Sequence, residues 1–246
     1  MSVIVFFSVL AILLGATALG LYFGATLPRH HLNRDSKDVI HAFMDINALL
    51  AAVVLGLLVF SAKSSFDTKD LEWKHASANI ILLDRLLAQY GPETRPAREK
   101  LRAAVERKLK QFEQPAAPRS KLVVRLEDVQ SQIGLLSPET DAQHWQKSKA
   151  LDVSNTIAQA RWFLLDEIGS TIPIPFLAVL MFWLAIIFFG HSLFAPRNMT
   201  TLGVIFLSAV SLAASVFLIM EMDQSLEGMI SISSEPLREA IKELGH

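Results

Sequence analysis

Uncharged apolar stretches alternate with polar segments along the chain. No charged side chain occurs in residues 1–28, 46–62, 168–196 and 198–220. A helix needs about 20 apolar residues to cross about 30 Å of hydrocarbon, so each stretch is long enough or nearly so. We therefore predict four transmembrane helices, near residues 3–26, 39–62, 171–194 and 200–221.

The helix of the second apolar stretch is predicted to continue without a break into the polar segment that follows it. The helix should end before Gly91, a residue typical of helix C-termini, and before Pro92, which cannot continue it. A single helix from Val39 to Tyr90 is about 78 Å long, far more than a bilayer is thick. We expect the excess to stand in water and to pack on other helices through Ile80, Leu83 and Leu87.

Three more helices are expected in the middle of the chain and one at its end. The first opens at Thr94 and Pro96, the third at Ser137 with Pro138 in its first turn, and the last at Ser234 and Pro236. Breaks are expected at Pro115 and Pro118, and Lys121–Val124 is the only strand candidate. Apolar residues at a spacing of three to four mark the first two of these helices: Leu101, Val105, Leu109 and Phe112, then Leu122, Leu126, Val129 and Ile133.

The predicted fold is therefore an all-α membrane protein with four transmembrane helices and a helical soluble domain inserted between the second and third. Residues 1–62 hold the first two crossings, 63–167 the soluble stalk domain, 168–221 the last two crossings, and 222–246 an acidic tail with a short amphipathic helix. Lys and Arg near the membrane number five on the side of the domain and four on the other side. This difference is too small to decide the orientation, and we expect the domain in the cytoplasm.

Composition narrows the possible functions. Hydrophobic residues make up 52% of the chain, which is typical of membrane proteins. The net charge of −1 gives no general attraction to nucleic acid, and the absence of Cys excludes disulfides and thiolate ligands. The chain contains no HExxH, GxSxG, GxxxxGK[ST] or GxGxxG motif, so we predict that it is not an enzyme.

The second crossing carries the candidate functional residues. Asp38, His41 and Asp45 form a polar stripe in its first turns, and Ala48, Ala52 and Gly56 follow every four residues. An ionisable residue near lipid is costly unless it meets water or a partner, so Asp45 favours an ion-handling face. The alternative for Asp38 and His41 is that they lie in headgroup water. For the small residues Ala48, Ala52 and Gly56, we favour close packing between helices. A metal site of Asp38, His41 and Asp45 with His30 or His31 is a further alternative.

Other motifs have structural and functional interpretations. Gly20 and Gly24 form a GxxxG pair typical of a packing seam, and the hydroxyls of Ser208, Ser211 and Ser215 favour packing too. Pro173 and Pro175 predict an irregular start of the third crossing. An acidic segment follows the fourth crossing and either binds calcium or forms a solvated turn; its carboxylates are Glu221, Asp223 and Glu227.

Several segments together resemble the bestrophin-like domain family of bacterial membrane proteins. The resemblance runs from about Tyr22 to Leu237 and is carried by VLGLLVFSAKSSFDTKDLE, ILLDRLLAQYGPE, GSTIPIPFLAVLMFW, LFAPRN and EMDQSLEGMISISS. It implies a pentameric, channel-like assembly in the bacterial inner membrane, with the second crossing lining the pore and the domain in the cytoplasm. It also implies a hydrophobic neck at Val53, Leu57 and Phe60, and calcium ligands among Glu221, Asp223 and Glu227.

We therefore predict an oligomeric ion channel whose second crossing lines the conduction path. A ring of Asp45 would favour cations. The alternative is a non-conducting membrane sensor or scaffold whose helical domain binds a partner. The expected partners are the lipid bilayer, further copies of the chain and inorganic ions, with no cofactor unless calcium binds.

Overall fold

The computed structural model of the chain describes residues 2–28, 34–113, 126–166, 174–223 and 232–244, and within these ranges it contains helices but no strand. The chain divides into two compact units. One comprises Met1–Ser65 and Ser170–Asp223, and the other comprises Phe66–Gly169 and Gln224–His246. Helix α2 (Arg34–Tyr90) contributes residues to both units, and it confirms the single long helix that was predicted from Val39 to Tyr90.

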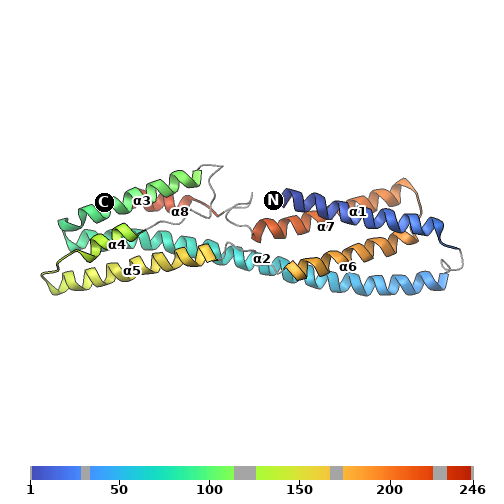
Figure 1. Cartoon of the computed structure of the whole chain (residues 1–246), viewed down its shortest axis with the longest axis horizontal. Coiled ribbons are helices and arrows are strands. Elements are labelled where there is room, and N and C mark those ends of the chain that lie inside the picture. The colour runs from blue at the N-terminus through green and yellow to red at the C-terminus, as the bar shows by residue number, and fades with distance from the viewer. Residues whose placement is uncertain (1, 29–33, 114–125, 167–173, 224–231, 245–246) are drawn as a thin grey trace. The chain divides into compact units, whose positions relative to one another are not determined.

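The first unit contains α1 (Ser2–Thr26), the N-terminal part of α2, α6 (Ile174–Leu193) and α7 (Met199–Asp223) (Figure 1). These four helices are long and apolar enough to cross a membrane, which agrees with the four crossings expected from the sequence. The predicted start of the third crossing at residue 171 and the irregular turn at Pro173 lie outside the described residues.

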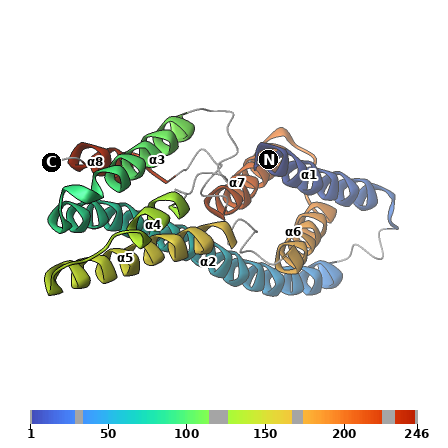
Figure 2. The same cartoon turned by 60° about the vertical axis from the view of Figure 1, so that its left-hand side comes forward.

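Helix α6 packs against both α1 and α2 (Figure 2). A Cβ atom on Gly20 of α1 would lie 2.9 Å from the Cβ of Ser192 and against the Phe189 carbonyl oxygen. A Cβ on Gly24 would meet the backbone of Leu193. The GxxxG pair is therefore a packing seam, as predicted, because only glycine lets the two backbones approach so closely.

Only one face of α2 joins the core of the first unit. That face contributes Ala51, Leu58 and Ala62, at a spacing of seven and four residues. The rest of this core comes from α1, α6 and α7, and its fully buried members include Leu13, Leu180, Ala209, Ala213 and Val216.

The second unit contains the C-terminal part of α2, η2 (Pro92–Thr94), α3 (Arg95–Glu113), α4 (Glu127–Gly134), α5 (Asp141–Asp166) and α8 (Glu235–Glu243) (Figure 1). Its core confirms the apolar positions predicted on these helices, except that Leu122 and the side chain of Phe112 lie outside the described residues, as do Pro115, Pro118 and the candidate strand. The buried members include Trp73, Ile80, Leu83, Leu87, Leu101, Val105, Leu126, Val129, Ile133, Ile157 and Leu237.

The C-terminal segment belongs to the core of the second unit. Leu237 and Ala240 of α8 are buried, and Ile232 and Leu244 on either side of α8 are buried too. The indole Nε1 of Trp73 donates a hydrogen bond to the carbonyl of Ser233 at 3.1 Å. The described part of the predicted acidic tail, with its short amphipathic helix, thus packs in the core of this unit together with Trp73 of α2.

Two helix boundaries show how local chemistry places an end. Gly91, which follows α2, has φ 145°, the only positive φ in the described part of the chain and a conformation that favours glycine. The predicted start of a helix at Ser137 is wrong, because α5 begins at Asp141. The hydroxyl of Thr140 accepts a hydrogen bond from the Gln143 backbone N–H at 3.2 Å, and the Gln143 side-chain oxygen accepts one from the Glu139 N–H at 2.8 Å. This pair resembles a capping box and fixes the start of α5.

Candidate pore-lining face

The face of α2 opposite its buried residues is uncovered in the subunit. Its large apolar residues follow one another at alternating intervals of four and three, so they form one stripe along the helix. Their exposed fractions range from 45% at Leu50 to 71% at Phe60. The stripe consists of Val39, Phe43, Ile46, Leu50, Val53, Leu57 and Phe60.

Val53, Leu57 and Phe60 belong to this stripe, whereas the other exposed residues predicted to line a pore lie about 110° away around the helix, on the neighbouring exposed surface. Asp38, Asp45, Ala52, Val53, Gly56, Leu57 and Phe60 are exposed, whereas His41 and Ala48 are half-buried. A Cβ on Gly56 would have no described atom within 4 Å. Ala52 and Gly56 therefore do not pack closely on another helix among the described residues of this chain, and close packing on a second copy stays a prediction.

His41 contacts the end of α6. The His41 ring lies 5.3 Å from the His191 ring and 5.7 Å from the Phe194 ring, measured between centroids. Its Nε2 is enclosed and has no hydrogen-bond partner among the described residues. The sequence interpretation missed His191, whose only signal was an imidazole at the end of an otherwise uncharged crossing.

The described residues do not support the metal alternative at the beginning of α2. No group of three His, Asp or Glu side chains in this part of the chain is arranged to hold a metal ion. Asp38, His41 and Asp45 therefore do not form a metal site by themselves. His30 and His31 lie outside the described residues.

The carboxylates at the end of α7 are not solvated. Glu221 is 2% exposed and Asp223 is 4% exposed, so the interpretation of these two residues as part of a solvated turn is wrong. Burial of a carboxylate is costly unless it is paired, hydrogen-bonded or bound to a cation. Glu227 lies outside the described residues, and calcium binding stays a prediction.

A family model, the Bestrophin-like domain, matches residues 11–237. The chain belongs to the bestrophin-like domain family. This confirms the resemblance seen in the sequence, and the match includes all of α2 and the acidic end of α7. Comparisons with curated proteins and with solved structures give no match. In this bestrophin-like chain, the candidate functional surface is thus the uncovered face of α2.

Proposed function

We propose that the chain is a subunit of a homo-oligomeric ion channel in which the uncovered face of α2 surrounds a shared water path. The supporting observation is the exposure of Asp45 in the apolar part of α2, within two turns of exposed Leu49 and Ala52. A carboxylate that faces lipid is costly, whereas one that faces water or another subunit is not. The apolar stretches of α1, α6 and α7 contain no charged residue of this kind before Glu221.

The assembly that we propose is a pentamer in the bacterial inner membrane, which is the arrangement that the resemblance noted in the sequence implies. Its second unit is a soluble helical domain on the cytoplasmic side, inserted between the second and third crossings. Val53, Leu57 and Phe60 form the narrow apolar part of the path, and the ring of Asp45 at its entrance selects cations. Glu221, Asp223 and Glu227 bind calcium in this proposal, which the clustering of carboxylates at the end of the last crossing supports.

Cysteine accessibility tests the central claim, because the natural chain has no cysteine. In the Ala52→Cys variant, a charged thiol reagent is expected to react from water and to reduce ion flux in liposomes. The matched control is Leu207→Cys on α7, where the native side chain is 70% exposed and should face lipid. The same reagent should leave this control unmodified and its flux unchanged.

A different result would favour the scaffold alternative. A monomeric particle, or an Ala52→Cys variant that reacts no faster than Leu207→Cys, removes the shared water path. The membrane helices would then serve as an anchor, and the second unit would carry the function by binding a partner.

A further inference from the structure

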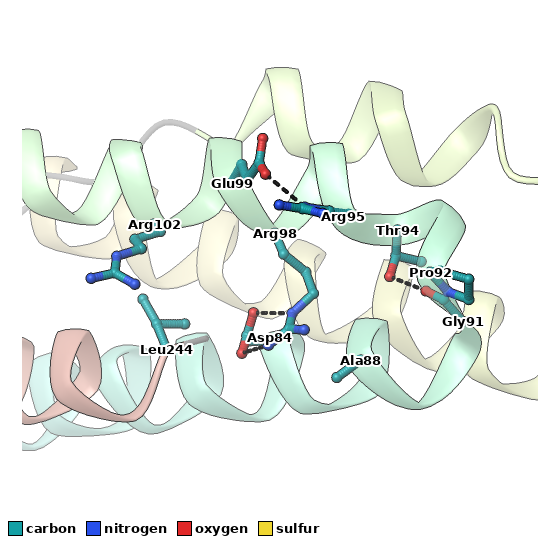
Figure 3. A pocket seen from close by; sticks show the side chains of 10 residues that line it. All are labelled: Asp84, Ala88, Gly91, Pro92, Thr94, Arg95, Arg98, Glu99, Arg102 and Leu244. Atoms are coloured by element: carbon teal, nitrogen blue, oxygen red, sulfur yellow. Dashed lines mark hydrogen bonds and ion pairs between the residues drawn. The ribbon is translucent and has the colours of Figure 1, made fainter. Parts of the chain in front are cut away.

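The second unit contains a polar groove that the channel proposal does not use (Figure 3). Its volume is about 490 Å³, and it lies between α2, the start of α3 and the residue that follows α8. Ala88 and Leu244 supply apolar surface, and three arginines of α3 supply most of the charge. A volume of this size is in the range of small-molecule sites.

An ion pair forms one side of the groove (Figure 3). Nε and Nη2 of Arg98 donate to the two carboxylate oxygens of Asp84 at 2.7 and 2.8 Å, and Asp84 is 3% exposed. The hydrogen bond to Asp84 raises the pKa of the Arg98 guanidinium, so Arg98 stays cationic. The pair with Asp84 uses two of the N–H donors of Arg98. A guanidinium has five N–H donors, so Arg98 keeps capacity for a ligand.

Arg95 and Arg102 lie one turn before and one turn after Arg98. Each is paired with a glutamate four residues later, Arg95 with Glu99 at 3.1 Å and Arg102 with Glu106 at 3.0 Å. The side chains of these two arginines are 82% and 53% exposed. Exposed pairs of this kind contribute little to stability, so both arginines can turn to a bound anion at small cost.

The start of α3 adds to the positive potential of the groove. The first turn of α3 contains no acidic residue, although carboxylates are favoured near the positive end of a helix and arginines are not. Here Arg95 and Arg98 occupy that turn. Asp84 neutralises Arg98, and the remaining charged groups of the lining are Arg95, Arg102 and Glu99. The lining itself therefore has one more positive than negative charge, and Glu106, which lies outside the lining, offsets that charge while it is paired with Arg102.

We propose that this groove binds a small multivalent oxyanion, held by Arg95, Arg98 and Arg102. The planar guanidinium matches two oxygens of a phosphate or carboxylate group, and arginines spaced along one helix face suit a ligand with more than one such group. Ala88 and Leu244 contact the remainder of the ligand. The site lies wholly in the second unit and does not depend on ion conduction.

Binding is tested with the full chain in detergent, near physiological ionic strength, by calorimetric titration with inorganic pyrophosphate and with citrate. The double variant Arg95→Ala, Arg102→Ala should weaken binding by about tenfold or more, because it removes two charge-assisted contacts. The matched control is Arg107→Ala, an exposed arginine of α3 outside the groove, whose Nε donates to the Ala103 carbonyl at 3.2 Å. The control should change affinity by less than about twofold.

Each outcome bears on the proposal. Tighter binding of pyrophosphate assigns the phosphate class, and tighter binding of citrate assigns the carboxylate class. The absence of saturable binding of either probe to the unsubstituted chain overturns the proposal. An equal loss in the double variant and in Arg107→Ala also overturns it, since it would indicate a general basic surface. Thermal unfolding of the variants should be unchanged, because the substituted side chains are exposed.

Discussion

The carbonyl oxygen of Phe189 in α6 occupies the space that a Cβ atom on Gly20 of α1 would need. The contact is between backbones, so it cannot be relieved by rotation of a side chain. In lipid, helices gain little from the hydrophobic effect, and close backbone approach is a main source of their association. The α1–α6 seam should therefore be sensitive to a single added methyl group.

The first prediction compares Gly20→Ala with Gly15→Ala. Alanine in a helix is normally more stable than glycine by about 0.8–1.0 kcal/mol. A Cβ on Gly15 meets no described atom within 4 Å, so Gly15→Ala should be neutral or stabilising. Gly20→Ala should destabilise by about 1–3 kcal/mol through overpacking. Thermal unfolding in detergent measures both, and a shift of the same sign in the two variants would contradict the seam.

The second prediction concerns Gly56→Leu, which places a large side chain on the uncovered face of α2. The subunit has room for it, so the melting temperature should not fall, but flux through liposomes should drop several-fold if this face lines the path. Gly203→Leu on α7 is the control, since a Cβ there also meets no described atom within 4 Å. Equal flux in the two variants would place Gly56 away from the path.

The third prediction is that Asp45→Asn reduces the preference for cations. Removing a ring of carboxylates from the entrance removes the attraction for cations and leaves the pore diameter unchanged. Reversal potentials in a salt gradient measure the change. A reversal potential equal to that of the unsubstituted protein would show that Asp45 does not face the path.

The fourth prediction concerns alkaline pH. Burial raises the pKa of the Tyr90 phenol above its ordinary value of 10.0, and the charges of Glu93 and Glu139 raise it further. The folded state then holds this proton more tightly than the unfolded state. The contribution to stability is complete below pH 10.0 and is lost as the pH rises through the folded-state pKa. The Tyr90→Phe variant should therefore lose less stability at alkaline pH than the natural chain.

Near neutral pH the same variant should be as stable as the natural chain or more so. The Tyr90 hydroxyl is buried and has no hydrogen-bond partner within the described ranges, so its removal costs no hydrogen bond. Melting temperatures at neutral and alkaline pH give both results. A clear destabilisation near neutral pH would show that the hydroxyl has a partner.

The fifth prediction tests calcium. If calcium alters ion flux, the double variant Glu221→Gln, Asp223→Asn should abolish the effect, because it removes two anionic ligands. The control is Glu239→Gln on α8, an exposed carboxylate outside this segment. No calcium response in the unsubstituted protein would remove the calcium part of the proposal.

The sequence was sufficient to predict features that depend only on residues near one another in the chain. Gly91 and Pro92 placed the end of α2, and the spacing of Ile80, Leu83 and Leu87 identified its packed side. The start of α5 was misplaced because Ser137–Pro138 and Thr140–Gln143 are both plausible caps, and only the hydrogen bonds of Thr140 and Gln143 decide between them.

Features that depend on contacts between distant segments could not be predicted in the same way. The contact of His41 with His191 joins two residues that are 150 positions apart in the chain. The burial of Glu221 and the exposure of Ala52 and Gly56 likewise follow from which neighbours each helix acquires in the fold. No periodicity along a single segment contains that information.

The participation of α8 in the core of the second unit decides which fragments of this protein can be expressed. A fragment that ends at residue 169 would lack Ile232, Leu237, Ala240 and Leu244, and would leave apolar surface of α2 and α3 open to solvent. Such a fragment should aggregate. A domain suited to isolated study needs the C-terminal segment rejoined to it by a linker, or supplied as a second chain.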